Sequence, residues 1–213
     1  MAQIILDLGS GLSTQNDTQY VDAIVQSIKE VDTGKHEVIL KAQLFTNQPP
    51  NVPLDQLVFN HLYMAGHEAG YKVTASVFDM ESLRFLLNFE VPFIKIACRE
   101  ELYWLIMEVP RKVPVWVSIQ NDREQAIVNG GGATKFLLCV PNYPALLFDY
   151  EQAAQAFNNP LSLGCVSDHT EGLALWYKHS PYIWEKHFVL ERDPNNPDAG
   201  PFAVTPSELA EIL

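Results

Sequence analysis

Residues 164–170 read GCVSDHT and residues 183–188 read IWEKHF. Each segment begins as a short apolar run and reaches a histidine within six residues. Short apolar runs bounded by polar residues are typical of buried strands. Imidazole is the commonest side-chain metal ligand, so two histidines at the exits of neighbouring strands could hold one divalent ion. Taken alone, each histidine could equally be a structural residue satisfied within the protein.

The same kind of apolar run recurs along the whole chain. Most of these runs are continuous rather than alternating, as expected for parallel strands that are covered on both faces. The predicted strands are Ile4–Leu8, Glu37–Gln43, Lys72–Phe78, Phe93–Cys98, Val113–Ile119, Lys135–Val140, Leu161–Val166 and Tyr182–Phe188. Helical patterns lie between several of them, at Gln19–Val31, Leu54–Ala69, Met80–Asn88, Glu100–Val109 and Tyr150–Phe157.

Eight strands with helical crossovers predict a (β/α)8 TIM barrel, with a doubly wound sheet as the alternative. The 213 residues form one predicted domain, residues 1–213, which is compact for a fold that usually takes about 250 residues. We therefore expect shortened crossovers. Asn121–Thr134 contains three glycines at 130–132 and is predicted to be a flexible connector without a full helix. It precedes a strand instead of opening a helix, so it lacks the context of a phosphate-binding loop.

Charge and cysteine content narrow the classes of function. The net charge of −12 predicts no binding to nucleic acid or to an anionic membrane surface. Cys98, Cys139 and Cys165 lie in apolar runs, which indicates reduced thiols and a cytoplasmic protein. No apolar stretch approaches membrane-spanning length, and the first residues lack the charged start of a signal peptide.

Two lysines, Lys41 and Lys95, stand inside apolar strands. Lysine is almost never buried unless an anion accompanies it. The anion could be a core carboxylate such as Asp7 or Glu185, or it could belong to a ligand. Because a largely acidic protein would need locally placed cations to bind an anionic substrate, the two lysines together favour a polyanionic ligand.

Several motifs in order along the chain resemble those of the sialic acid synthase family, the phosphoenolpyruvate-condensing (β/α)8 barrels. They are Lys41-x-Gln43, ASVFDMES at 75–82, Lys95-Ile96-Ala97, Asn142-Tyr143-Pro144, SDHTEG at 167–172, and EKHF at 185–188 followed by Asp198. The resemblance runs from about Glu37 to the last residue. Before Glu37 it is thin, with Asp7 at a position where the family usually has a glutamate.

The resemblance implies an enzyme that joins C3 of phosphoenolpyruvate to the aldehyde of an open-chain N-acyl amino sugar. Lys41 and Lys95, with Ser76 and Ser167, would hold the phosphate and carboxylate of phosphoenolpyruvate. His169 and His187 would bind a divalent metal, typically Mn²⁺ with Mg²⁺ as the alternative, which would polarise the aldehyde oxygen. Glu185 would handle protons beside the metal. The implied sugar contacts are Gln43, Glu100, Tyr143 and Asp198.

The chain also departs from the family pattern. Cys98 stands in place of a serine, Arg99 in place of a small residue, and Ser118-Ile119-Gln120 in place of Ser-Thr-Gly. Because the sequence ends at Leu213, we expect no C-terminal antifreeze-protein-like domain, which in the family supplies an arginine to the partner subunit's sugar pocket. The sequence therefore does not identify the acceptor aldehyde. A homodimer is possible, but the sequence does not decide the oligomeric state. The alternatives are a catalytically impaired barrel that acts as a binding or assembly protein, and a different metal-dependent aldolase or lyase.

Overall fold

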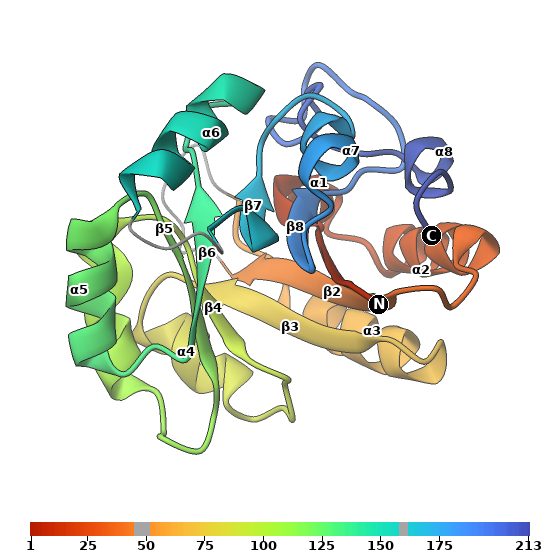
Figure 1. Cartoon of the computed structure of the whole chain (residues 1–213). Helices are drawn as coiled ribbons and strands as arrows, with labels where there is room; N and C mark the ends of the chain where they lie inside the picture. The colour runs from red at the N-terminus through yellow and green to blue at the C-terminus, as the bar shows by residue number, and fades with distance from the viewer. Residues whose placement is uncertain (45–51, 158–161) are drawn as a thin grey trace.

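The chain forms a closed barrel of parallel strands (Figure 1). A computed structural model describes residues 1–44, 52–157 and 162–213. Within these residues eight strands pair in sequence order, and β8 pairs with β1 to close the sheet. The strands are β1 (Gln3–Asp7), β2 (Glu37–Leu44), β3 (Lys72–Val77), β4 (Ile94–Ile96), β5 (Val115–Ile119), β6 (Lys135–Cys139), β7 (Cys165–Asp168) and β8 (Ile183–His187). The closing pair confirms the predicted (β/α)8 barrel and excludes the doubly wound sheet.

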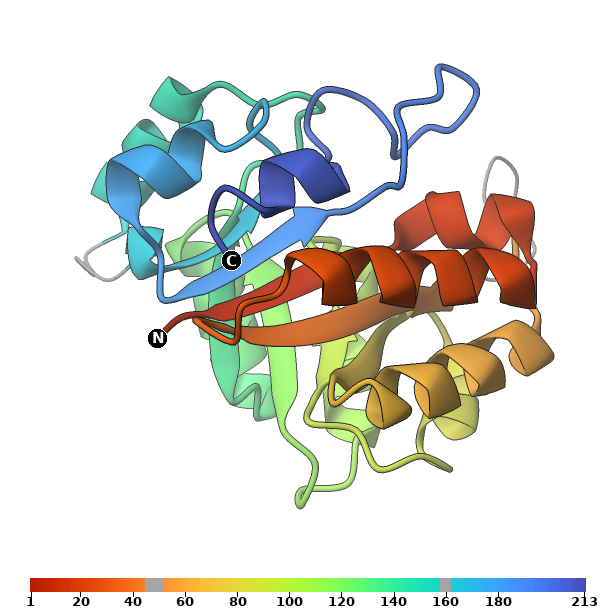
Figure 2. The same ribbon diagram turned by 90° about the vertical axis from the view of Figure 1, so that its right-hand side faces the viewer.

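Helices surround the barrel, and α2 and α3 lie side by side on its outer surface (Figures 1 and 2). Several crossovers are short, as expected: α7 has 6 residues, α4 has 7, and the fourth crossover is the 3₁₀ helix η1. The helices are α1 (Gly9–Gln15), α2 (Thr18–Val31), α3 (Gln56–Glu68), α4 (Met80–Leu86), η1 (Glu100–Glu108), α5 (Asp122–Gly131), α6 (Leu147–Ala156), η2 (Ser162–Gly164), α7 (Ala174–His179) and α8 (Pro206–Leu209). None of the helices in the described ranges is long and apolar enough to cross a membrane.

Helix α2 shows how the sequence specifies these elements. Asp17 caps its first turn by accepting a hydrogen bond from the Gln19 backbone N–H at 3.0 Å. Val21, Ile24 and Ile28 recur at helical spacing and are buried against the sheet. The opposite face carries exposed polar side chains, among them Asp22, Gln26 and Lys29, so the helix lies on the outside of the barrel.

The prediction of a connector at Asn121–Thr134 is wrong, because the structure has helix α5 there. Asn121 caps the helix by accepting from the Glu124 backbone N–H at 3.0 Å. Gly132 ends it with a φ of 94°, a left-handed conformation that favours glycine. At Gly131 a Cβ would lie 3.2 Å from Ile106 of η1, so a glycine lets the two helices approach closely. The glycines therefore terminate and pack a short helix.

The seventh strand also differs from its prediction. The apolar run was expected to form a strand over Leu161–Val166, but β7 begins at Cys165 and continues to Asp168. Ser162–Gly164 forms the short 3₁₀ helix η2, and Leu161 lies outside the described residues. The strand thus extends into the polar SDH segment, which brings that segment into the barrel wall.

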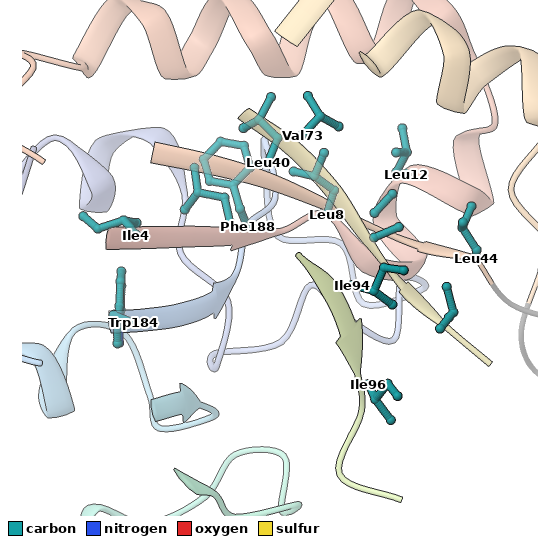
Figure 3. Packing of buried hydrophobic residues seen from close by; sticks show 14 of the residues in the cluster. Ile4, Leu8, Leu12, Leu40, Leu44, Val73, Ile94, Ile96, Trp184 and Phe188 are labelled. Carbon is teal, nitrogen blue, oxygen red and sulfur yellow. The ribbon is translucent and has the colours of Figure 1, made fainter. Parts of the chain in front are cut away.

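Most of the hydrophobic core lies in two clusters, and a third, small cluster consists of Val189, Ala199 and Ala203. The larger part fills the space between sheet and helices and includes Ile4, Leu40, Val73 and Trp184 (Figure 3). The smaller part lies inside the barrel and consists of inward-facing residues of six strands or their starts: Ile5, Ile39, Phe93, Trp116, Leu137 and Ile183. In this inner cluster the rings of Phe93 and Trp116 stack with centroids 3.9 Å apart. These side chains fill the barrel from below, and the polar residues above them line a cavity at the carboxyl ends of the strands.

Candidate active site

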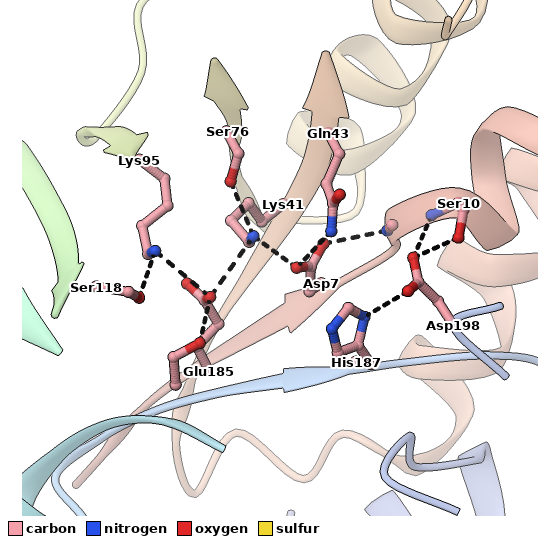
Figure 4. A network of polar contacts seen from close by, with 12 residues as sticks. Asp7, Ser10, Lys41, Gln43, Ser76, Lys95, Ser118, Glu185, His187 and Asp198 are labelled. Carbon is pink, nitrogen blue, oxygen red and sulfur yellow. Dashed lines mark hydrogen bonds and ion pairs between the residues drawn. The ribbon is translucent and has the colours of Figure 1, made fainter. Parts of the chain in front are cut away.

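A cavity of about 610 Å³ opens at the carboxyl ends of the barrel strands. This is the face on which (β/α)8-barrel enzymes carry their catalytic groups. Every site residue expected from the sequence except Glu100 lines it: Lys41, Gln43, Ser76, Lys95, Tyr143, Ser167, His169, Glu185, His187 and Asp198. They come from strands and loops spread over the whole chain, and closure of the barrel brings them together. Figure 4 labels seven of them, with Lys41, Lys95 and Glu185 at the centre.

Lys41 of β2 is held at the cavity floor by carboxylates of β1 and β8. Its side chain is 2% exposed, and its Nζ lies 2.6 Å from Asp7 Oδ2 and 3.6 Å from Glu185 Oε1. Nζ also donates to Ser76 Oγ at 3.0 Å. Burial disfavours the charged amine, but Asp7 and then Glu185 outweigh this effect and raise the pKa of Lys41. Lys41 is therefore a fixed cation.

Lys95 lies on the other side of Glu185 and has weaker partners. Its side chain is 1% exposed, and Nζ lies 3.6 Å from Glu185 Oε1. It donates to Ser118 Oγ at 2.7 Å and to the Ile96 carbonyl at 3.1 Å. Burial dominates here and lowers the pKa of Lys95, although Glu185 opposes the shift. The charged form of Lys95 is thus only partly compensated by the protein.

Glu185 stands between the two lysines at the centre of the cavity floor (Figure 4). Burial opposes its ionisation, but Lys41 and Lys95 outweigh burial and lower the pKa of Glu185. Ser167 Oγ donates to Oε1 at 2.9 Å. The other oxygen, Oε2, is buried and has no hydrogen-bond partner among the described residues. Buried polar atoms of folded proteins nearly always have a hydrogen-bond partner, so this oxygen indicates a place where another molecule can bind.

His169 and His187 face each other above this polar floor, with ring centroids 5.6 Å apart. The Nδ1–H of His169 donates to the Val140 carbonyl at 2.9 Å, which leaves Nε2 as the acceptor nitrogen. Burial, and then the neighbouring His187, lower the pKa of His169 to about 4, so its ring is neutral at neutral pH. The ring of Tyr143 lies over His169 with centroids 4.2 Å apart.

His187 has an incomplete set of partners. Its Nδ1 is buried and lies 3.8 Å from Asp198 Oδ1, too far for a hydrogen bond. The second oxygen of Asp198 accepts from both the backbone N–H and the hydroxyl of Ser10 at 2.5 Å. Gln43 donates to Asp7 Oδ2 at 2.9 Å from the same side of the cavity. Gln43 thus joins the wall of the cavity to the Asp7–Lys41 pair of its floor, and Asp198 is fixed to Ser10 of α1.

Glu100 does not lie in the cavity. It is the first residue of η1, is exposed, and pairs with Arg123 of α5 through two hydrogen bonds of 2.9 and 3.1 Å. The residue before it, Arg99, lines the cavity instead, with its guanidinium 5.7 Å from the ring centre of Phe78. The crossover after β4 therefore presents a cation, where the resemblance implied a carboxylate.

Several further residues line the cavity without a role in the sequence-based site, among them Asp7, Ser118 and Cys139. Each of these three is inward-facing and is the last or second-last residue of its strand, as Ser167 is. Strand periodicity carries this signal, since residues two apart share a face. Cys139 Sγ lies 4.0 Å from His169 Nδ1, so the thiol is part of the histidine environment.

The arrangement can bind a small polyanion and act on it. Two buried cations, hydroxyl donors and a carboxylate lie below, and two imidazoles with an aromatic ring lie above. Within the described ranges, however, no group of three or more His, Cys, Asp or Glu side chains is placed to hold a metal ion. A metal here would be bound by the two histidines, with water or substrate oxygens at its other positions.

The protein is a closed parallel barrel with lysines, carboxylates and histidines at the carboxyl ends of its strands. These features define a (β/α)8 protein with a cavity of the type found in enzymes. The NeuB family model matches residues 22–213. The chain therefore belongs to the NeuB family, which confirms the resemblance to the sialic acid synthases. A comparison with curated protein sequences gives no match.

Solved structures share the fold at low sequence identity. An N-acetylneuraminic acid (sialic acid) synthetase from Leptospira borgpetersenii, in complex with citrate, matches with a TM-score of 0.75 and 18% identity over 99% of this chain and 80% of that one. The spore coat polysaccharide biosynthesis protein SpsE of Bacillus subtilis matches with a TM-score of 0.73 and 20% identity. The match covers 99% of this chain and 65% of that one. A phospho-2-dehydro-3-deoxyheptonate aldolase of Thermotoga maritima matches with a TM-score of 0.68 and 12% identity, over 99% of this chain and 67% of that one.

Proposed function

We propose that the protein condenses phosphoenolpyruvate with an N-acyl amino sugar, or a similar aldehyde, and releases phosphate. In this reaction C3 of phosphoenolpyruvate forms a bond to the aldehyde carbon, water adds at C2, and the bond from C2 to the phosphate oxygen breaks. The product is a 2-keto-3-deoxy acid. Membership of the NeuB family supports this class of reaction.

The observation that carries the proposal is the pair of buried lysines on either side of Glu185. A phosphate or carboxylate entering the cavity can accept from both amines and complete the compensation that Lys95 lacks. Ser76 and Ser167 line the same floor. The Ser76 hydroxyl accepts from Lys41 and can donate its own proton to a further oxygen of the ligand, whereas the Ser167 hydroxyl donates to Glu185. The carboxylate of Glu185, whose Oε2 has no donor among the described residues, is placed to exchange a proton with the reacting groups.

A divalent metal fits the two histidines chemically. His169 keeps Nε2 as an acceptor because Nδ1 is engaged by the Val140 carbonyl. His187 has a buried Nδ1 without a hydrogen-bond partner in the described part of the chain. When bound, Mn²⁺ or Mg²⁺ would act as a Lewis acid toward a substrate oxygen. The histidines themselves need only stay neutral and fixed, which the environment of His169 provides.

The acceptor would lie above the phosphoenolpyruvate, toward the mouth of the cavity. Gln43, Tyr143 and Asp198 are the residues we assign to it. Tyr143 is 53% exposed and stacks on His169, so its ring can cover one side of a bound aldehyde. Glu100 pairs with Arg123 outside the cavity and has no role in this assignment.

The test is phosphate release from phosphoenolpyruvate with Mn²⁺ across a panel of aldehydes that includes N-acetylmannosamine and shorter sugars. We expect release that depends on the aldehyde and is lost in His187→Ala. Binding of phosphoenolpyruvate and of Mn²⁺ is measured in parallel by calorimetry. Protein that binds both but gives no aldehyde-dependent release would contradict the proposal in favour of a non-catalytic binding barrel.

A further inference from the structure

Behind the two histidines, on the outer face of the sheet, Lys186 and Asp168 form an ion pair that is wholly buried. Their charged atoms lie 3.2 Å apart and both side chains are 0% exposed. The two residues are register partners across β7 and β8. Each directly precedes a histidine of the cavity, and because successive side chains of a strand point to opposite faces, the pair lies outside the barrel while the histidines line the inside.

Lys186 holds the chain on both sides of His169. Its Nζ pairs with Asp168, the residue before His169, and donates to the carbonyl of Thr170, the residue after it, at 2.6 Å. Lys186 is itself the residue before His187. One side chain therefore connects the segments that carry both histidines.

Asp168 is equally constrained. Its Oδ1 accepts from the backbone N–H and the hydroxyl of Thr170, both at 2.7 Å. Its Oδ2 accepts from the indole N–H of Trp184, seen on β8 in Figure 3, at 2.8 Å. With these bonds the carboxylate fixes the turn through which the chain leaves β7 and sets the direction of His169.

Packing of the hydrophobic core does not require an ion pair at these two positions. At the same level of the sheet, Lys186 is in register with Leu6, and Leu6 with Leu40, and both leucines are buried. Apolar side chains thus fill this layer next to β8. Replacing a buried ion pair by well-packed apolar residues is often neutral or stabilising, so burial alone gives no reason for a lysine and an aspartate here.

We propose that Lys186 and Asp168 are positioning residues, which set the separation and direction of His169 and His187 and thereby the affinity of the divalent metal site. The inference rests on the metal binding proposed above. Partners that orient metal ligands without touching the metal typically change metal affinity by about 10- to 100-fold when they are replaced. A purely structural pair would change the stability of the protein and leave the affinity of the folded form unaltered.

The experiment is a Mn²⁺ titration of the full chain, followed by the electron paramagnetic resonance signal of free Mn²⁺. The variants are Lys186→Met and the double variant Asp168→Asn/Lys186→Met, which leaves no unpaired charge and keeps the test available if the single variant does not fold. Leu62→Ala is the matched control: Leu62 is buried on α3, which packs against β3, and its truncation lowers stability away from β7 and β8. Each variant is titrated well below its unfolding transition.

We expect both Lys186 variants to bind Mn²⁺ about 10- to 100-fold more weakly than the unaltered protein, and Leu62→Ala to bind it as the unaltered protein does. Equal affinity in a folded Lys186 variant would overturn the inference and leave the metal proposal standing. Equal weakening in Leu62→Ala would overturn it as well, since general loosening would then explain the effect. If the unaltered protein binds no Mn²⁺, the proposed metal itself fails and the positioning role fails with it.

Discussion

Replacing Lys95 with methionine is expected to abolish most phosphoenolpyruvate binding while costing little stability, whereas Lys41→Met is expected to lower both. The difference follows from their partners. Lys41 lies 2.6 Å from Asp7, so its removal leaves a buried carboxylate without a cation, a change that typically costs about 3–5 kcal/mol. Among the described residues the one carboxylate paired with Lys95 is Glu185, at 3.6 Å, and Glu185 keeps Lys41 when Lys95 is removed.

The direction of the pKa shift of Lys95 also predicts that Lys95→Met costs less stability than Lys41→Met. Burial lowers the pKa of Lys95 below the value of an unfolded chain, so at neutral pH the charged amine opposes folding. Methionine removes this penalty. What is lost are the attraction to Glu185 and the hydrogen bonds to Ser118 and the Ile96 carbonyl. A hydrogen bond from a charged donor is worth about 1.5–3 kcal/mol, and the removed burial penalty offsets much of this loss. Lys95→Met should therefore unfold only slightly more easily than the unaltered protein.

Ligand binding should respond differently. Losing one partner of a desolvated charge pair costs about 2–5 kcal/mol, which corresponds to roughly 30-fold to several thousand-fold in affinity. Calorimetry with phosphoenolpyruvate and urea unfolding measure the two effects, with Lys72→Met, at the opposite end of the barrel, as the control. Unchanged affinity in both lysine variants would refute the reasoning and make the lysines structural ion-pair partners. Equal loss of stability in both would refute the assignment of Lys95 as an uncompensated cation.

Three further predictions concern the histidines and the packing. The unaltered protein should bind about one divalent ion per chain and the double variant His169→Ala/His187→Ala none; equal metal content in elemental analysis would contradict the assignment. In metal-free protein, the pKa of His169 is lowered to about 4, so the unfolded chain takes up the proton first and stability should fall as the pH drops from about 6.5 to 4. The loss should approach about 3 kcal/mol in urea titrations and be absent in His169→Gln; parallel pH profiles would count against it. Gly66→Ala should destabilise the protein by about 1–3 kcal/mol in thermal unfolding, because its Cβ would lie 2.6 Å from Val73 Cγ2; an unchanged midpoint would show that the strand can yield.

The sequence was sufficient to predict most of the fold. Apolar runs of strand length, with helical patterns between them, located the eight strands to within a few residues, because hydrophobic periodicity is a local property. It also located the inward-facing Lys41, Glu185 and His187, since residues two apart in a strand share a face. The prediction failed at α5, where a run of glycines obscured a helix whose cap is Asn121 and whose last turn packs closely on Ile106.

Features that depend on which strands become neighbours could not be read from the sequence. Whether Lys41 pairs with a carboxylate depends on β1 and β2 lying in register, which places Asp7 beside it. Glu100 lies outside the cavity because it pairs with Arg123 of α5. The contacts of Lys186 with Asp168 and Thr170, on either side of His169, depend on the pairing of β7 with β8. Local periodicity fixes the face on which a side chain lies. Barrel closure then decides which charges meet at the distances where ion pairs and hydrogen bonds act, and these contacts give the cavity its chemistry.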